Sequence, residues 1–323
     1  MIRTFTRDAC LGHRAPLGFP ERPQRLTGIL GHLRELGWPV EDPGADREGA
    51  RPAVEAVHDP AYVARFEGAS ERGDGLLDSA DNPLSAGTWE AAWGAVEATL
   101  AAADAVMAGA GPAFAAVRPP GHHAERAVAM GFCFFNNVAV AAEHLLRRHG
   151  LSRVAIFDFD VHHGNGTQHT FEDRADVFYA STHQYPFYPG TGARQERGRG
   201  AGEGFTLNVP LPAHTGDEDY AEAIAGQVIP ALRAFAPEAL LLSAGFDAWA
   251  RDPLGGMEVT GAGFHEWGLR LRDLAEEACG GRILALLEGG YDEPSLPWLV
   301  EEHLRGLAGA GRAAPKGQAT ESS

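Results

Sequence analysis

The chain has 323 residues, and its 27 Lys and Arg residues against 44 Asp and Glu residues give a formal charge of −17. This negative charge opposes binding to phosphate backbones and anionic membranes, so we expect no nucleic-acid partner and no membrane partner. Apolar residues make up 44% of the chain and charged residues 22%, which argues against a disordered chain or a coiled coil.

The cysteines and the apolar runs indicate a cytoplasmic protein. Cys10, Cys133 and Cys279 are far apart and form no CxxC pair, which argues against a disulfide framework and a thiolate zinc site. Charges interrupt every apolar stretch of the first residues, and no run of 18 apolar residues occurs. We therefore expect neither a signal peptide nor a membrane span.

Strands and helices are predicted to alternate through one domain, residues 1–305, followed by a flexible C-terminal tail, residues 306–323, whose small and polar residues show no period. Apolar runs that end before a polar loop predict strands at 113–117, 154–159, 177–180, 239–243 and 283–287. Helical spacing of apolar residues predicts helices at 85–108, 136–149, 220–235 and 263–278. This alternation predicts an α/β fold with a single open, mostly parallel β-sheet and helices on both faces.

In such sheets ligands bind beyond the carboxyl ends of the strands, so the loops after the five predicted strands should form one site. One of these loops begins with the segment 158–162, DFDVH. Alternate side chains of a strand share a face, so Asp158, Asp160 and His162 should point together.

Two carboxylates on one buried strand are costly unless they are paired or bound to a cation. For a single Asp, an Arg or a helix N-terminus would be an equally good partner. Asp247 ends another predicted strand, and with Asp160 and His162 it would make a three-ligand site with one open position. Oxygen and nitrogen ligands suit Zn²⁺ and leave Fe²⁺ and Co²⁺ open.

Two further loops carry candidate catalytic groups. His122 and His123 could be surface residues, but beside a metal they could move a proton to and from water, because His titrates near neutrality. Tyr291 follows two glycines, which let the backbone approach a site closely. A lone Tyr is usually a buried aromatic residue, but here its hydroxyl could polarise a carbonyl.

Seven motifs occur in a fixed order along the chain. They are RPPGHHA (118–124), GFCFFNN (131–137), FDFDVHHGNGTQ (157–168), YPGTG (188–192), LNVPL (207–211), SAGFDA (243–248) and LEGGY (287–291). This set resembles the zinc-dependent histone deacetylase family over about residues 11–304. The RPPGHH form, and Asn165 where class I members usually have Asp, resemble the class II and bacterial deacetylase-like amidohydrolase branch.

The resemblance implies two metal ions. The ligands of one catalytic zinc ion would be Asp160, His162 and Asp247. A structural potassium ion would be bound by the backbone carbonyls of Asp158, Asp160, His162, Ser181 and Thr182.

The resemblance also implies catalytic roles. His123 would act as general base and then as general acid, with Asn165 as a neutral partner. His122, oriented by Asp158, would assist electrostatically, and Tyr291 would donate to the substrate carbonyl oxygen.

A substrate tunnel is implied by the same resemblance, and its residues would be Asp81, Gly131, Phe132, Tyr188 and Leu254. Phe132 and Tyr188 would form opposite walls, and Tyr188 replaces the commoner Phe, which leaves the acyl-chain preference open. Leu254 would lie at the rim, where the polyamine-selective class II enzyme has a Glu. Asp81 would hold substrate amides. Phe132 and Leu254 could instead be core residues and Asp81 a turn residue.

The sequence therefore predicts a zinc-dependent amidohydrolase that removes acetyl or short acyl groups from Nε-acyl-lysine in proteins or peptides. An acetylpolyamine or other small N-acetyl-amine deacetylase shares this chemistry and stays open. A binuclear manganese ureohydrolase resembling arginase would need more Asp ligands in DxHxD order, and a silent acyl-lysine binding module would need neither the His pair nor Tyr291. A monomer and a homo-oligomer both stay open.

Seven of the histidines outside the motifs are predicted to be surface residues or hydrogen-bonded side chains without a role in the site. They are His13, His32, His58, His144, His149, His265 and His303. Arg25 resembles an Arg of the family's internal acetate channel.

Overall fold

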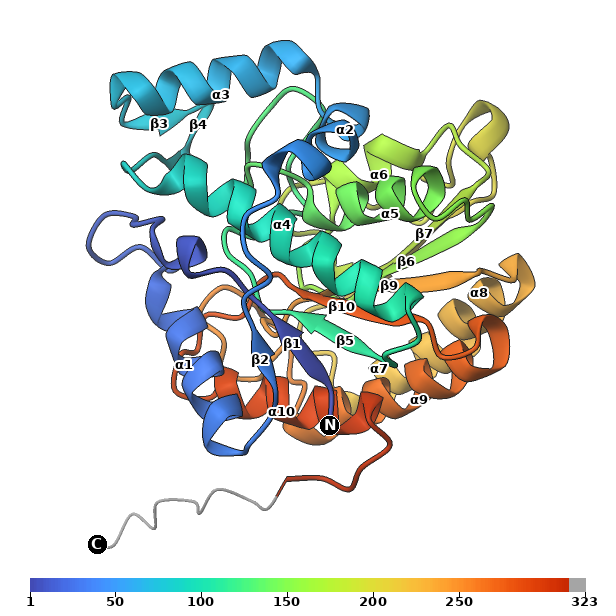
Figure 1. The fold of residues 1–323 in the computed structure, drawn as a ribbon. Coiled ribbons are helices and arrows are strands. Elements are labelled where there is room, and N and C mark those ends of the chain that lie inside the picture. The colour runs from blue at the N-terminus through green and yellow to red at the C-terminus, as the bar shows by residue number, and fades with distance from the viewer. Residues whose placement is uncertain (314–323) are drawn as a thin grey trace, which may run out of the picture.

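Eight strands form one sheet in the computed structural model, which describes residues 1–313 (Figure 1). Their spatial order is β2 (Val40–Glu41), β1 (Arg3–Phe5), β5 (Ala113–Ala115), β10 (Ile283–Leu287), β9 (Ala239–Ala244), β6 (Val154–Asp158), β7 (Val177–Gln184) and β8 (Thr206–Leu211). Every neighbouring pair is parallel. The predicted open, parallel sheet is therefore confirmed.

The five predicted strands are the five neighbours β5, β10, β9, β6 and β7 in the middle of this order. Every residue of these five strands is buried, as expected for parallel strands covered on both faces. Because all strands are parallel, the loops that follow them meet at one edge. The predicted strand 154–159 ends one residue early, at Asp158.

Helices cover both faces of the sheet (Figure 1). One face is covered by α4 (Thr88–Met107) and α5 (Asn137–Arg147), beside which lie α2 (Arg47–Val57), α3 (Pro60–Arg72) and α6 (Asn165–Phe171). The other face is covered by α1 (Pro23–Glu35), α7 (Asp217–Ala223), α8 (Ile229–Phe235), α9 (Gly261–Cys279) and α10 (Leu296–Leu307). Of the helices in residues 1–313, none combines the length and the apolar character that crossing a bilayer requires.

Smaller elements complete the fold. They are the short helices Asp8–Leu11 and Gly200–Gly202 and the two-stranded sheet of β3 (Leu76–Leu77) and β4 (Ser79–Pro83). The helix predicted at 220–235 is instead divided into α7, a π-helical turn (Ile224–Val228) and α8. Pro230 lies in the first turn of α8, and because it has no N–H the regular hydrogen bonding changes there.

The end of the fold differs from the predicted boundary at residue 305. Helix α10 continues to Leu307, which is buried against the core. Residues 314–323 of the predicted tail lie outside the described residues.

A buried ion pair anchors the loop that follows β5. Arg118 donates from Nε and Nη2 to the two carboxylate oxygens of Glu21, each at 2.6 Å, and both side chains are fully buried. Its Nη1 donates to the carbonyls of Cys10 and His13. Burial alone would raise the pKa of Glu21, but the Arg118 charge lowers it to about 2.

Glu21→Gln should lower the free energy of unfolding by about 3 kcal/mol at pH 7, because Arg118 would keep its charge in the core without a charged partner. The folded-state pKa of Glu21 lies below its ordinary value of 4.5, so this stabilisation is present above pH 4.5 and is lost as the pH falls towards 2. Urea unfolding of wild type and Glu21→Gln should therefore show a smaller difference in unfolding free energy at pH 3 than at pH 7.

The exposed pair of Arg233 and Glu277 supplies the control. Glu277→Gln should change the unfolding free energy by less than about 0.5 kcal/mol, because exposed ion pairs contribute little. Equal losses for the two substitutions would contradict the role given to the buried pair.

Candidate active site and metal centre

Asp160, His162 and Asp247 bring three ligand atoms within 4.8 Å of one another. Asp160 and His162 lie in the loop after β6, and Asp247 lies in the loop after β9, the neighbouring strand. His162 Nδ1 lies 3.1 Å from Asp160 Oδ1 and 3.2 Å from Asp247 Oδ2. The structure thus brings together the three residues that the sequence proposed as metal ligands.

The loop after β6 is shaped by its own carboxylates rather than by strand alternation, which corrects the expected geometry. Asp158 Oδ1 accepts from the Asp160 N–H, and Asp160 Oδ1 accepts from the His162 N–H. Such side-chain bonds to the backbone two residues on compete with the sheet ladder. The chain therefore leaves the sheet after Asp158, and Asp160 and His162 meet Asp247 from a turn.

A backbone cradle fixes the two carboxylates. Asp160 Oδ2 accepts from the Gly289 N–H at 2.8 Å, and Asp247 Oδ1 accepts from the Val161 N–H at 2.9 Å. A Cβ at Gly289 would lie 2.0 Å from Asp247 Oδ2 and 2.6 Å from Asp160 Oδ2. Gly289 is therefore needed for the close approach of the two acids.

The donor set fits a divalent metal. Asp160 and Asp247 are both fully buried, and Asp247 Oδ2 is a buried atom without a hydrogen-bond partner among residues 1–313. Two buried carboxylates beside a single histidine leave negative charge that a cation would neutralise. Two carboxylates and one imidazole are ligands that suit zinc.

His122 is held by Asp158. Its Nδ1 lies 3.0 Å from Asp158 Oδ2, which also accepts from the Tyr179 hydroxyl at 3.3 Å. Burial would lower the pKa of His122, but the Asp158 and Asp160 carboxylates raise it to about 10. His122 therefore carries a positive charge near neutral pH.

His123 is held by Asn165. The Asn165 amide nitrogen donates to Glu125 Oε1 at 2.5 Å, which turns Oδ1 towards His123 Nδ1 at 2.7 Å. His123 Nδ1 is then the donor, and Nε2 is left as an acceptor. Burial, together with the charges of His122 and His162, holds the pKa of His123 well below its usual value, so the ring is neutral.

Tyr291 lines the same pocket as His122 and His123, and a hydrogen bond fixes its backbone. Its N–H donates to Asp252 Oδ2 at 2.6 Å, and the Arg25 guanidinium lies 4.6 Å from the centre of its ring. Arg25 is buried and also donates to the carbonyls of Glu288 and Gly290, so it supports the loop that carries Tyr291. Burial raises the pKa of Tyr291 well above its usual value, and the hydroxyl keeps its proton.

A pocket of about 320 Å³ leads to these groups. Nine of the predicted site residues line it: Asp81, His122, His123, Gly131, Phe132, His162, Tyr188, Leu254 and Tyr291. Tyr188 is 39% exposed, and its hydroxyl donates to Asp81 Oδ2, which also accepts from the Gly131 N–H. Asp81 therefore ties two other rim residues together.

A histone deacetylase domain model matches residues 19–307. The chain belongs to the histone deacetylase family. The family and fold predicted from the motifs are therefore confirmed, and members of this family depend on zinc.

Individual relatives agree. The histone deacetylase-like amidohydrolase of Pseudomonas aeruginosa is 41% identical over 301 residues, which cover 91% of this chain and 78% of that protein. The chloroplastic histone deacetylase 10 of Oryza sativa is 50% identical over 196 residues, 61% of this chain, and this match spans only 44% of the rice protein. The crystal structure of an acetylpolyamine aminohydrolase from Burkholderia pseudomallei has a TM-score of 0.85 at 33% identity, covering 97% of this chain and 100% of the other.

Two residues that support the candidate active site were not identified from the sequence. Glu288 is buried, and its Oε2 accepts from the backbone N–H groups of Gly121 and His122; burial raises its pKa to about 7. Phe187 stacks on His162 with ring centres 5.4 Å apart. Both residues lie in or beside the quoted motifs, which is the signal that could have identified them.

Gly289→Ala should abolish most zinc binding without unfolding the protein, because the new methyl group would occupy the space between the Asp160 and Asp247 carboxylates. The measurement is the zinc content of the purified protein by mass spectrometry, with circular dichroism as the test of folding. Gly31→Ala is the matched control, because a Cβ at Gly31 on α1 meets nothing within 4 Å. A Gly289→Ala protein with the zinc content of the Gly31→Ala protein would contradict the cradle.

Proposed function

We propose that this chain removes acetyl or short acyl groups from Nε-acyl-lysine in proteins or peptides, with one zinc ion held by Asp160, His162 and Asp247. The observation that carries the proposal is the pocket. Its aromatic wall leads to the group of Asp160, His162 and Asp247 and to the neighbouring His122 and His123. Phe132 and Tyr188 on this wall suit the uncharged alkyl stem of an acylated lysine. A free ammonium would lose its hydration there.

The chemistry divides between the metal and the chain. When bound, zinc would lower the pKa of a water ligand and polarise an amide carbonyl. His123 Nε2 accepts the proton of the water that attacks the acyl carbon. As the C–N bond breaks, His123 returns this proton to the departing amine, so the products are acetate and a free amine.

The neighbouring side chains assist these proton transfers. Protonated His122, oriented by Asp158, places a positive charge beside the developing negative charge. The Tyr291 hydroxyl donates to the carbonyl oxygen as that oxygen becomes negative. Asn165 keeps His123 in the tautomer whose Nε2 is free, since Asn165 Oδ1 accepts from Nδ1.

We extend the proposal to a structural potassium ion bound by the backbone carbonyls of Asp158, Asp160, His162, Ser181 and Thr182. The pairing of β6 with β7 supports it, because Asp158, the last residue of β6, is the register partner of Ser181 within β7. This places the two groups of carbonyls next to one another.

A small acetylated amine, such as an acetylpolyamine, is the second candidate substrate. The overall similarity to the acetylpolyamine aminohydrolase of Burkholderia pseudomallei favours it. Leu254 at the rim opposes it, because an uncharged side chain gives no attraction to the second ammonium of a polyamine. The Asp81 carboxylate also opposes it, because it already accepts hydrogen bonds from the Gly131 N–H and the Tyr188 hydroxyl.

The proposed function is tested by turnover of the zinc-loaded full chain on an acetyl-lysine peptide, longer acyl-lysine peptides, acetylputrescine and acetylspermidine. We expect the acetyl-lysine peptide to give the highest kcat/KM. Higher kcat/KM for both acetylpolyamines would replace the first candidate by the second. Hydrolysis of none of these compounds by protein that contains zinc would contradict both.

Tyr291→Phe should lower kcat by about 10²–10³-fold and leave the zinc content unchanged, because only the donor to the carbonyl oxygen is removed. Tyr220→Phe is the matched control, since the Tyr220 hydroxyl is buried without a hydrogen-bond partner among residues 1–313. Equal kcat values for the two variants would remove Tyr291 from the mechanism.

Leu254→Glu should raise kcat/KM for acetylspermidine about five- to tenfold relative to the acetyl-lysine peptide, because a carboxylate at the rim would attract the second ammonium. The gain should fall as salt is added. Leu254→Gln has the same size without the charge and should give no such gain. If Gln and Glu shift the preference equally, charge at residue 254 does not select the substrate.

A further inference from the structure

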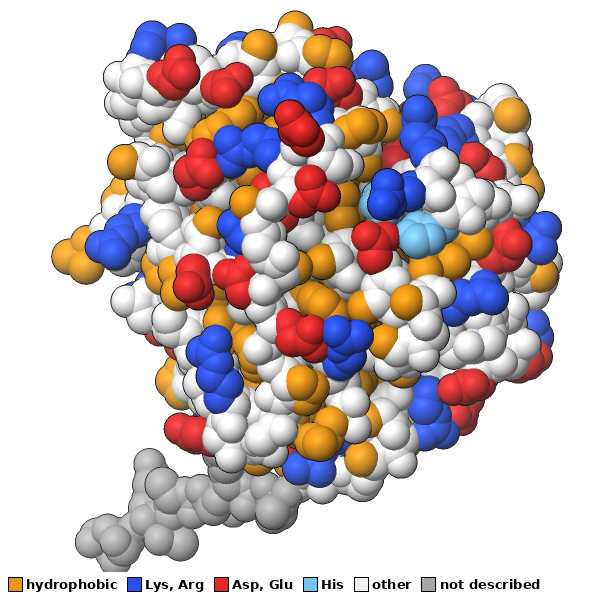
Figure 2. All heavy atoms as spheres, in the orientation of Figure 1, with side chains coloured by type: hydrophobic (Ala, Val, Ile, Leu, Met, Phe, Trp, Pro, Cys, Tyr) orange, Lys and Arg blue, Asp and Glu red, His pale blue; other side chains and the backbone are white. Residues whose placement is uncertain are grey.

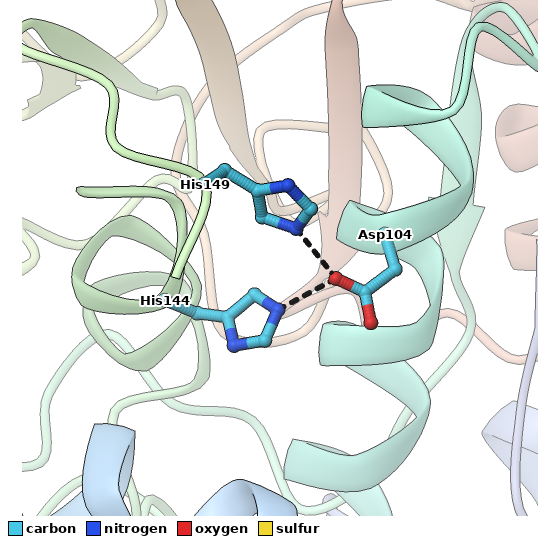
Figure 3. Close-up of side chains that lie close together, drawn as sticks. All are labelled: Asp104, His144 and His149. Carbon is cyan, nitrogen blue, oxygen red and sulfur yellow. Dashed lines mark hydrogen bonds and ion pairs between the residues drawn. The ribbon is translucent and has the colours of Figure 1, made fainter. Parts of the chain in front are cut away.

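A second group of metal-ligating side chains lies outside the pocket. Asp104 comes from α4, His144 from the last turn of α5, and His149 from the turn after α5 (Figure 3). This end of α5 leads into the start of β6, so the group lies at the amino edge of the sheet, opposite the edge that carries the catalytic loops.

The three side chains converge on one oxygen atom. His144 Nε2 lies 2.7 Å from Asp104 Oδ1, and His149 Nε2 lies 2.6 Å from the same oxygen (Figure 3). The two rings are 5.3 Å apart at an angle of 67°, so the nitrogens approach from different directions. Both histidines bond to the same Asp104 oxygen, and the other carboxylate oxygen is bonded to neither of them (Figure 3).

The ligand atoms of this group lie close together, like those of Asp160, His162 and Asp247. Among residues 1–313, two groups of three bring ligand atoms within 4.8 Å of one another: Asp160, His162 and Asp247, and this group. Two imidazoles and one carboxylate form a three-ligand set that leaves a fourth position for water, and the borderline-soft nitrogens select transition-metal ions over Ca²⁺ or Mg²⁺.

One side chain of the group is buried, and the other two reach solvent. The side chain of His144 is 7% exposed, that of His149 is 23% exposed and that of Asp104 is 45% exposed. Figure 2 shows histidine side chains reaching the surface over α5. An ion in solution can therefore reach three ligands of which one is fixed in the core.

The surrounding charge favours a cation. A cavity of about 170 Å³ adjoins Asp104 and His144 and is also lined by Asp46, Glu97 and Arg148. Three carboxylates and one guanidinium line this cavity, and Arg7 Nε lies 3.5 Å from Glu97 Oε2, so the carboxylates still outnumber the guanidinium groups. Glu97 Oε1 is buried and has no hydrogen-bond partner within residues 1–313.

The local backbone explains how His149 reaches Asp104. The last helical residue of α5 is Arg147, and Gly150 has φ +69°, a conformation that glycine adopts without strain. The chain therefore reverses directly after α5 and places the His149 ring beside that of His144. A ligand held by all three residues would join α4 to the end of α5.

We propose that Asp104, His144 and His149 bind a divalent transition-metal ion, with zinc as the test ion, at a second site separate from the catalytic one. Without metal, the two histidines donate their Nε2 protons to Asp104 Oδ1. Metal binding requires each Nε2 to lose its proton: a neutral ring is protonated at Nδ1 instead, a protonated ring releases its Nε2 proton to solvent, and both Nε2 atoms are then ligands. The ion ties α4 to α5, so its effect is on stability rather than on the acyl-transfer chemistry.

The test is zinc stoichiometry of the full chain, measured by calorimetric titration after removal of metal with a chelator. Wild type should bind two equivalents, and His149→Ala and Asp104→Asn should each bind one. His214→Ala is the matched control, because exposed His214 pairs with Glu258 through one nitrogen and should leave two equivalents. His149→Ala should also lose part of the zinc-dependent rise in Tm.

Two results would overturn the second site. One is a wild type that binds a single equivalent which His149→Ala retains, because the three residues would then be a hydrogen-bonded group only. The other is a second equivalent that His149→Ala and Asp104→Asn both retain. Either result leaves the proposed deacetylase function intact, since that function depends on the equivalent that survives in His149→Ala.

Discussion

Three fully buried carboxylates at the ends of β6 and β9 determine how the rest of the site is built. The side chains of Asp158, Asp160 and Asp247 are buried close to one another, where water cannot screen their charges. Each needs a compensating positive charge or a set of N–H donors. His122 pairs with Asp158, backbone N–H groups donate to both oxygens of Asp160, and one backbone N–H donates to Asp247. The remaining negative charge is what a metal ion would balance.

A second layer of buried charge fixes the loops that supply these partners. Arg118 binds Glu21 and holds the loop of His122 and His123 against the N-terminal segment. Glu288 accepts from the backbone of that same loop, and Arg25 supports the loop of Tyr291. These loops are therefore attached to the core by hydrogen bonds, which hold His122, His123 and Tyr291 in place beside the proposed metal ligands.

The central strands were predictable because their physical signal is local. The runs 239–242 and 283–287 are apolar throughout, as is typical of strands buried on both faces. The edge strands β2 and β8, and β1 next to β2, are short or partly exposed and lack this signal. The proposed metal ligands were predicted from their residue types, but their convergence depends on hydrogen bonds from side chains to backbone that alternation along a strand does not describe.

Contacts between distant segments were not predictable from spacing. His144 and His149 were expected to be surface or hydrogen-bonded residues, and their shared partner Asp104 could not be identified because it lies on another helix, 40 residues before His144 and 45 before His149. His13, His58 and His303 are buried and hydrogen-bonded, as expected for side chains outside the site. Glu288 and Asp252 are acids whose positioning role appears only when two loops meet.

The central claim is that the buried carboxylates of the catalytic loops hold a metal ion, and X-ray diffraction at the zinc absorption edge tests it most directly. Crystals of the zinc-loaded protein should give an anomalous peak about 2 Å from His162 Nδ1 and from one oxygen each of Asp160 and Asp247. An anomalous map without a peak between these three residues, in crystals that contain zinc, would contradict the account.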